Sequence, residues 1–231
     1  MTNRLTSLVM LGSEACCHAP VWECLESCCR LSDDLMVCDL GMPLHAEKTV
    51  AEFSRVKRKL RVEKFYDVAD VLETAKIDSK WIVFVFGDEV VHEDSMHYLW
   101  DLVSHHGDSF DGAAVPVHVV FASWYASSEH GVGGYRDIRL VDSQSTNFMA
   151  YDGTRFFLPD SRIAPMELNP KPIWKLLMAF SSADPFGGIM PPYPFGQEHE
   201  QAVPASLRRF LGRVACSSPY IQKDTFHERQ L

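Results

Sequence analysis

Two acidic residues stand where the sequence could do chemistry. Asp39 ends the short apolar run Leu35–Cys38, which predicts a strand, and Asp184 opens the glycine-rich segment Asp184-Pro-Phe-Gly-Gly. A carboxylate just past the end of a parallel strand lies where open α/β sheets bind ligands. The Asp184-Pro-Phe-Gly-Gly segment itself predicts a tight, glycine-rich loop.

Longer patterns surround both acids. A helix, a turn and a strand are predicted over Glu23–Asp39, and an Asn-Pro-Lys-Pro turn followed by an amphipathic helix precedes Asp184. The apolar face of that second helix is formed by Ile173, Leu176, Leu177 and Phe180. An Arg-Arg-Phe-Leu-Gly segment at 208–212 and a Tyr-Ile pair at 220–221 follow. In this order the segments resemble the amino-methyltransferases that transfer a methyl group from S-adenosylmethionine to adenine N6 or cytosine N4.

The resemblance implies an α/β chain with a Rossmann-like methyltransferase fold and S-adenosylmethionine as its cofactor. It implies that Asp39 is the catalytic acid, within a motif that continues here as Leu40, Gly41 and Met42. It places the cofactor contacts at Lys171, Asp184, Pro185, Phe186, Gly187 and Gly188.

Both motifs depart from the family pattern. The two prolines and the aromatic that follow the catalytic acid in the family are missing after Asp39, so base orientation and stacking would be lost, each worth roughly 1–3 kcal/mol. The cofactor loop continues as Ile189-Met-Pro-Pro, and prolines remove amide donors. We therefore predict a degenerate, non-catalytic methyltransferase-like subunit of a ribonucleoprotein or methyltransferase assembly, with weak or no cofactor binding. The alternatives are an active nucleic-acid amino-methyltransferase and, with no defined nucleophile–base pair, an unrelated α/β hydrolase or transferase; whether the chain is an enzyme stays open.

Two surfaces are candidates for contact with nucleic acid or with protein partners. A charged helix is predicted over Thr49–Arg61, and its basic run extends to Lys64. The basic side chains are Arg55, Lys57, Arg58, Lys59, Arg61 and Lys64. They suit phosphate contacts, although an ordinary solvent-exposed helix face would show the same sequence pattern. The stiff loop Pro191–Phe195 offers Tyr193 and Phe195 as aromatic anchors for a protein interface.

Alternating helix and strand patterns position these residues. The predicted strands are Leu8–Leu11, Leu35–Asp39, Trp81–Phe86, Val115–Trp124, Tyr135–Val141 and Thr146–Tyr151. The predicted helices are Ala19–Leu31, Thr49–Arg61, Tyr66–Ala75 and Ser95–His105. Trp81–Phe86 is an unbroken apolar run, as in a strand covered on both faces. These patterns predict a mostly parallel twisted sheet with helices on both faces and an antiparallel pair near one edge.

Composition sets the remaining limits. The 231 residues suit one domain spanning 1–231, and a net charge of −9 argues against a globally basic nucleic-acid binder. No secretory signal or membrane-spanning run is evident, so we expect an intracellular protein. The 7 cysteines are then expected to be reduced core thiols. A zinc site among the N-terminal cysteines is the less favoured alternative, and no metal site is predicted.

Overall fold

The computed structural model describes residues 5–12, 19–62, 68–121, 135–148, 150–151, 156–157, 163–164 and 173–177. Within them lie four α-helices: α1 Val21–Leu31, α2 Leu44–Glu52, α3 Val68–Ala75 and α4 Glu93–His106. The larger sheet contains β1 Leu5–Leu11, β2 Asp34–Asp39, β3 Arg58–Arg61, β4 Trp81–Phe86, β5 Glu89–Val91, β6 Gly112–Phe121, β7 Tyr135–Asp142 and β10 Ile173–Leu177. A 3-10 helix, η1 Ser143–Phe148, and a small two-stranded sheet of β8 Ala150–Tyr151 and β9 Phe156–Phe157 complete the described elements.

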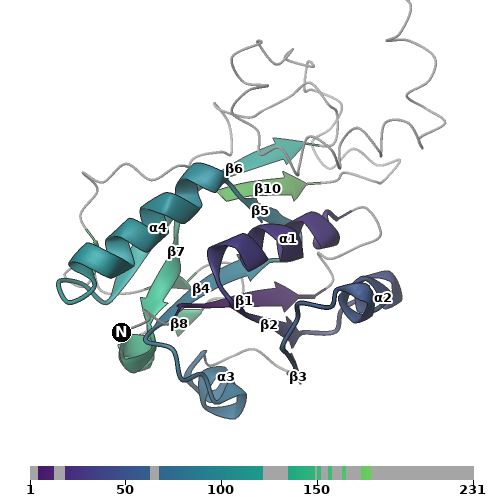
Figure 1. The fold of residues 1–231 in the computed structure, drawn as a ribbon, viewed down its shortest axis with the longest axis horizontal. Helices are drawn as coiled ribbons and strands as arrows, with labels where there is room; N and C mark the ends of the chain where they lie inside the picture. The colour runs from purple at the N-terminus through teal and green to yellow at the C-terminus, as the bar shows by residue number, and fades with distance from the viewer. Residues whose placement is uncertain are drawn as a thin grey trace, which may run out of the picture.

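The larger sheet has eight strands in the order β3-β2-β1-β4-β7-β6-β10-β5 (Figure 1). β3, β2, β1 and β4 are parallel neighbours, as are β6 and β10. β7 runs antiparallel to both β4 and β6, and β5 runs antiparallel to β10 at the outer edge. The prediction of a mostly parallel α/β sheet is therefore confirmed.

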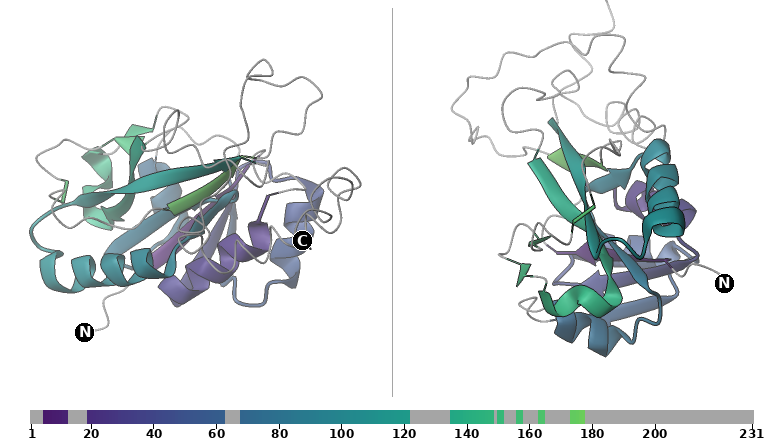
Figure 2. Two further views of the ribbon diagram at one scale, coloured as in Figure 1. Left: turned by 90° about the horizontal axis from the view of Figure 1, so that it is seen from above. Right: turned by 90° about the vertical axis from the view of Figure 1, so that its left-hand side faces the viewer.

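Helices cover both faces of the sheet, as the alternating patterns predict (Figure 2). On one face, α1, α2 and α4 pack against side chains such as Val9, Val37 and Val83. On the other face, α3 packs against the alternate residues of the same strands, among them Leu8 and Phe84. β1 and β4 are buried along their whole length because side chains of successive residues enter opposite layers of the core.

Three predicted elements were wrong. Where the sequence predicts a helix with Ile173, Leu176, Leu177 and Phe180 on its apolar face, Ile173–Leu177 form strand β10, which pairs in parallel with β6. The helix expected over Thr49–Arg61 is the end of α2 followed by strand β3, which pairs with β2. Short apolar runs of this kind fit both the helical and the strand periodicity, and pairing with a neighbouring strand decides between the two structures. Of the strand expected over Thr146–Tyr151, residues 146–148 belong to η1 and Ala150–Tyr151 form β8, and the antiparallel pair at the sheet edge is β10 with β5.

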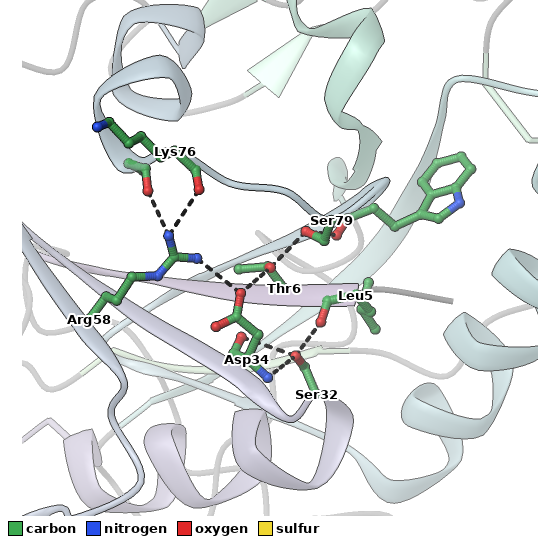
Figure 3. A network of polar contacts seen from close by, with 9 residues as sticks. Leu5, Thr6, Ser32, Asp34, Arg58, Lys76 and Ser79 are labelled. Atoms are coloured by element: carbon green, nitrogen blue, oxygen red, sulfur yellow. Dashed lines mark hydrogen bonds and ion pairs between the residues drawn. The ribbon is translucent and has the colours of Figure 1, made fainter. Parts of the chain in front are cut away.

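A polar network closes the amino end of the first three strands (Figure 3). Asp34 Oδ2 accepts hydrogen bonds from Thr6 Oγ1 at 2.6 Å and from Arg58 Nη2 at 3.1 Å. Arg58 Nη1 also donates to the carbonyls of Ala75 at 2.7 Å and Lys76 at 3.0 Å, where α3 ends. Lys76 has φ 49°, the left-handed conformation common just after a helix. Arg58 thus joins β2, β3 and α3 at the edge opposite the carboxyl ends of the strands.

No helix among the described residues is long and apolar enough to span a bilayer. The organisation of the whole of 1–231 as one domain stays a prediction.

Candidate ligand-binding site

The carboxyl ends of β2, β1 and β4 meet at one edge of the sheet. Backbone hydrogen bonds between neighbouring strands continue up to that edge: Leu40 N donates to Leu11 O at 2.8 Å, and Gly87 N donates to Met10 O at 3.0 Å. Strand β2, which follows β1 in the chain, lies on one side of β1 in the sheet, and β4 lies on its other side. Strand order therefore reverses between β1 and β4. Open α/β sheets bind ligands in the crevice outside such a reversal.

Asp39 is the last residue of β2 and stands at this edge. Its Oδ1 accepts hydrogen bonds from the amides of Gly41 at 3.0 Å and Met42 at 2.9 Å. An aspartate that binds the amides of the next residues forms a compact turn. The turn needs glycine at position 41, where φ is +91° and side chains are strained. The Asp39 carboxylate therefore fixes the conformation of the segment that follows β2.

The Asp39 carboxylate is ionised. Its burial acts to raise its pKa, but the hydrogen bonds from Met42 and Gly41 and the charges of Lys59 and Arg61 outweigh that effect. The pKa of Asp39 therefore lies below its ordinary value. Only 12% of the Asp39 side chain is exposed, so a ligand can reach the carboxylate over a small area only.

Lys59 supplies a cation beside this carboxylate. It lies on β3, and its Nζ is 3.6 Å from Asp39 Oδ2 and 3.4 Å from Glu47 Oε1. The first distance is longer than a hydrogen bond, so Asp39 Oδ2 keeps room for another donor. An acceptor on the last residue of β2 and a cationic donor on the neighbouring strand β3 therefore lie side by side.

The turn between β4 and β5 forms the other side of the edge. It consists of Gly87 and Asp88, and both residues are buried. Glu89 Oε2 accepts a hydrogen bond from Phe86 N at 2.9 Å, and Glu89 Oε1 accepts one from Arg139 Nη2 at 2.7 Å. Neighbouring strands lie about 4.8 Å apart, so two strand spacings place this turn about 10 Å from Asp39, the scale of a nucleotide.

Comparison with known proteins gives partial structural likeness. No protein-family model matches the chain. No curated protein matches it either. Staphylococcus aureus TarS, residues 1–349 in complex with UDP-GlcNAc, matches 56% of this chain and 36% of its own, at 9% identity and a TM-score of 0.38. Glucosyl-3-phosphoglycerate synthase from Mycobacterium tuberculosis, in complex with Mn²⁺ and UDP-glucose, matches 52% of this chain and 44% of its own, at 16% identity and a TM-score of 0.35. The matched region spans less than two thirds of each of these proteins.

The recognition as an S-adenosylmethionine-dependent amino-methyltransferase was wrong. The two solved structures named above hold UDP-sugars, and one of them also holds Mn²⁺. In addition, the helix that should precede the cofactor loop is strand β10. Both functional interpretations that depended on this recognition were therefore wrong, namely the degenerate methyltransferase-like subunit and the active nucleic-acid methyltransferase. The assignment of S-adenosylmethionine as cofactor was wrong as well.

The structure describes only part of the predicted site. Leu40, Gly41 and Met42 lie with Asp39 at the carboxyl edge. The predicted cofactor and loop residues lie outside the described residues, as does one of the basic residues: Lys64, Lys171, Asp184, Pro185, Phe186, Gly187, Gly188, Tyr193 and Phe195. Whether Asp39 is catalytic stays a prediction, as do nucleic-acid and protein partners.

The basic run does not form a helix face. Arg55 donates to the carbonyl of Cys29, Arg58 to the carbonyls at the end of α3, and Lys59 lies beside Asp39. Lys57 and Arg61 are exposed. Three of these charges therefore make separate contacts within the chain, and contact of the basic run with phosphates stays a prediction.

The described cysteines are Cys24, Cys28, Cys29 and Cys38, all buried free thiols. Among the described residues no group of three histidine, cysteine or acidic side chains could hold a metal ion. Sequence reasoning missed Glu89, Arg139 and the approach of Lys59 to Asp39. The only sequence signal was the acidic Gly87-Asp-Glu segment directly after the most apolar strand.

Proposed function

We propose that this chain binds a nucleotide at the carboxyl edge of β2, β1 and β4, and that the nucleotide is the leaving group of an activated sugar used in glycosyl transfer. The observation that carries the proposal is the ionised Asp39, at the end of a parallel strand beside the reversal of strand order. An acid in this position in open α/β sheets can accept a hydrogen bond from a bound nucleotide. Asp39 Oδ2 keeps that capacity because the turn amides bind Oδ1.

The pairing of Asp39 with Lys59 favours a base that offers a donor beside an acceptor. The imide edge of uracil does so, since its N3–H lies between two carbonyls. The carboxylate can accept the N3–H while the ammonium donates to a carbonyl. Cytosine presents an acceptor at N3, which the carboxylate would repel. UDP-sugars, the ligands of the similar structures named above, are therefore the first compounds to test.

In glycosyl transfer, the bond between the anomeric carbon and the diphosphate oxygen breaks, and its electron pair leaves with the nucleoside diphosphate. An acceptor hydroxyl forms the new bond to the anomeric carbon and releases its proton to solvent. Asp39 and Lys59 act in this proposal as binding residues for the nucleotide. The described residues do not by themselves fit a divalent cation, because they lack a cluster of three ligands and Glu89 binds Arg139. No step of the proposal passes through a metal.

Isothermal titration with UDP, UDP-glucose, CDP and S-adenosylmethionine tests the proposal. We expect UDP and UDP-glucose to bind, and CDP and S-adenosylmethionine to bind far more weakly. Asp39→Asn should weaken UDP binding about 10- to 100-fold, since a hydrogen bond to a charged group contributes about 1.5–3 kcal/mol. Asp33→Asn, an exposed substitution near the opposite end of β2, is the matched control and should leave the affinity unchanged. Absence of UDP binding at millimolar concentration, or equal affinities of wild type and Asp39→Asn, would overturn the proposal.

A further inference from the structure

A β-bulge in β7 sets the position of Arg139. Leu140 pairs with Ala113 of β6, whereas Ile138 pairs with the next residue, Ala114. Arg139 is therefore an extra residue between two consecutive pairs. On its other side, β7 pairs with β4 only from Asp142 to Leu140. A bulge re-aims the side chain it carries, and bulges are frequent next to functional sites.

The re-aimed side chain reaches the end of β4. The Arg139 guanidinium lies 4.8 Å from the centroid of the Phe86 ring, and its Nη2 donates to Glu89 Oε1 at 2.7 Å. The side chains of this ion pair are 1% and 0% exposed. Glu89 Oε2 in turn accepts the Phe86 amide at 2.9 Å. One carboxylate thus joins the bulge in β7 to the residue that precedes the Gly87–Asp88 turn.

Helix α1 and strand β1 supply further contacts to the same segment. The Cys24 thiol of α1 donates to the Phe86 carbonyl at 3.3 Å, and Gly87 N donates to Met10 O at 3.0 Å. The peptide group between Phe86 and Gly87 is therefore bound on both sides by partners distant in the sequence, and the Phe86 amide is bound by Glu89. This arrangement leaves the turn little freedom to move at the edge where we place the nucleotide.

A buried ion pair is a poor device for stability, because desolvation of both charges offsets their attraction and apolar replacements are often as stable. Its value lies in geometry, since the charge-assisted bonds accept only a narrow range of distances and angles. We propose that Glu89 and Arg139 are positioning residues that hold the Gly87–Asp88 turn in the conformation needed for nucleotide binding. This inference rests on the function proposed above and adds residues that do not touch the ligand.

The double variant Glu89→Gln/Arg139→Met tests the inference without leaving a single buried charge. Glutamine keeps an acceptor for the Phe86 amide, so the variant should fold. Val141→Ala, a core truncation on the same strand, is the matched control for a loss of stability alone. Two quantities are measured on each full-length protein: amide hydrogen exchange of the segment 84–91 without ligand, and the dissociation constant of UDP.

We expect the double variant to exchange at least tenfold faster in segment 84–91 and to bind UDP about tenfold more weakly, at a melting temperature close to that of wild type. Val141→Ala should lower the melting temperature and change neither quantity. Equal exchange and equal affinity in the double variant and wild type would overturn the positioning role. If wild type does not bind UDP, the proposed function fails, and the exchange rates decide alone whether the pair holds the turn.

Discussion

Lys59 Nζ on β3 lies 3.6 Å from Asp39 Oδ2 on the neighbouring strand β2. The two residues are 20 positions apart in sequence, and parallel pairing of β2 with β3 brings them together. The ammonium lowers the pKa of Asp39 and at the same time lies where a ligand would approach. Replacing Lys59 therefore tests both the electrostatics and the recognition at this edge.

Lys59→Met should raise the pKa of Asp39 toward its ordinary value while the turn amides remain bound. The carboxyl carbon of Asp39 reports this pKa directly in an NMR titration. We expect UDP binding to weaken as well, because the donor to the base carbonyl is lost. Lys57→Met, an exposed lysine on the same segment, should change neither quantity. An unshifted Asp39 titration would show that Lys59 does not influence the carboxylate.

Asp39 also makes the free energy of unfolding depend on pH. Because its pKa is lower in the folded chain, its stabilising contribution is present above the unfolded value near 4 and is lost as pH falls through the folded pKa. Asp39→Asn should cost about 1 kcal/mol at pH 7, and its difference from wild type should shrink toward pH 3. Urea unfolding at several pH values measures this, and a difference that grew on acidification would contradict the assignment.

Gly41→Ala should destabilise the protein through its backbone alone. The position has φ +91°, and an added Cβ would meet no atom within 4 Å. We expect a cost of about 1–2 kcal/mol, since a side chain disfavours left-handed backbone. Leu44→Ala, an exposed neighbour in α2, serves as the control and should change stability by less than about 0.5 kcal/mol. Equal melting temperatures for Gly41→Ala and wild type would refute the strained turn.

Arg58 should matter for stability and not for the ligand. Its guanidinium joins Asp34 to the two carbonyls at the end of α3, at the amino edge of the sheet. Arg58→Ala should lower the free energy of unfolding by about 1–2 kcal/mol, because part of the network is solvent-exposed. Arg61→Ala, an exposed cation on the same strand, should cost less. A change in UDP affinity larger than twofold in Arg58→Ala would contradict the separation of the two edges.

The buried thiols should be unreactive in the folded protein. Burial raises the pKa of Cys38 to about 12, with a contribution from the Asp39 charge, and burial raises the pKa of Cys24 well above its ordinary value. Neither forms appreciable thiolate at pH 8, and thiolate is the reactive form. Iodoacetamide followed by peptide mass spectrometry should find both unmodified in the native state and modified in urea. Rapid native labelling of Cys38 would show that the end of β2 opens readily.

The sequence predicts the first part of this fold well because its signals are local. Trp81–Phe86 is apolar at every position, so it reads as a doubly covered strand, and it is one. Leu35–Asp39 is a similar run and was also predicted correctly, within one residue. The acid at the end of that strand marks the edge of the sheet without any knowledge of strand order. The resemblance to methyltransferases, by contrast, combined short motifs whose placement in the fold the sequence did not show.

What the sequence alone determined is the mostly parallel α/β sheet, the helices on both faces and the position of Asp39 at the end of a strand. Tertiary structure alone decided that Ile173–Leu177 is a strand, because five residues carry too little periodicity and the partner strand β6 supplies the backbone bonds. Tertiary structure alone also brings Arg139 into contact with Glu89, 50 positions apart, through a bulge that no local sequence pattern predicts. A propensity acts between near neighbours in the chain, whereas a site at the edge of a sheet is assembled by strand order.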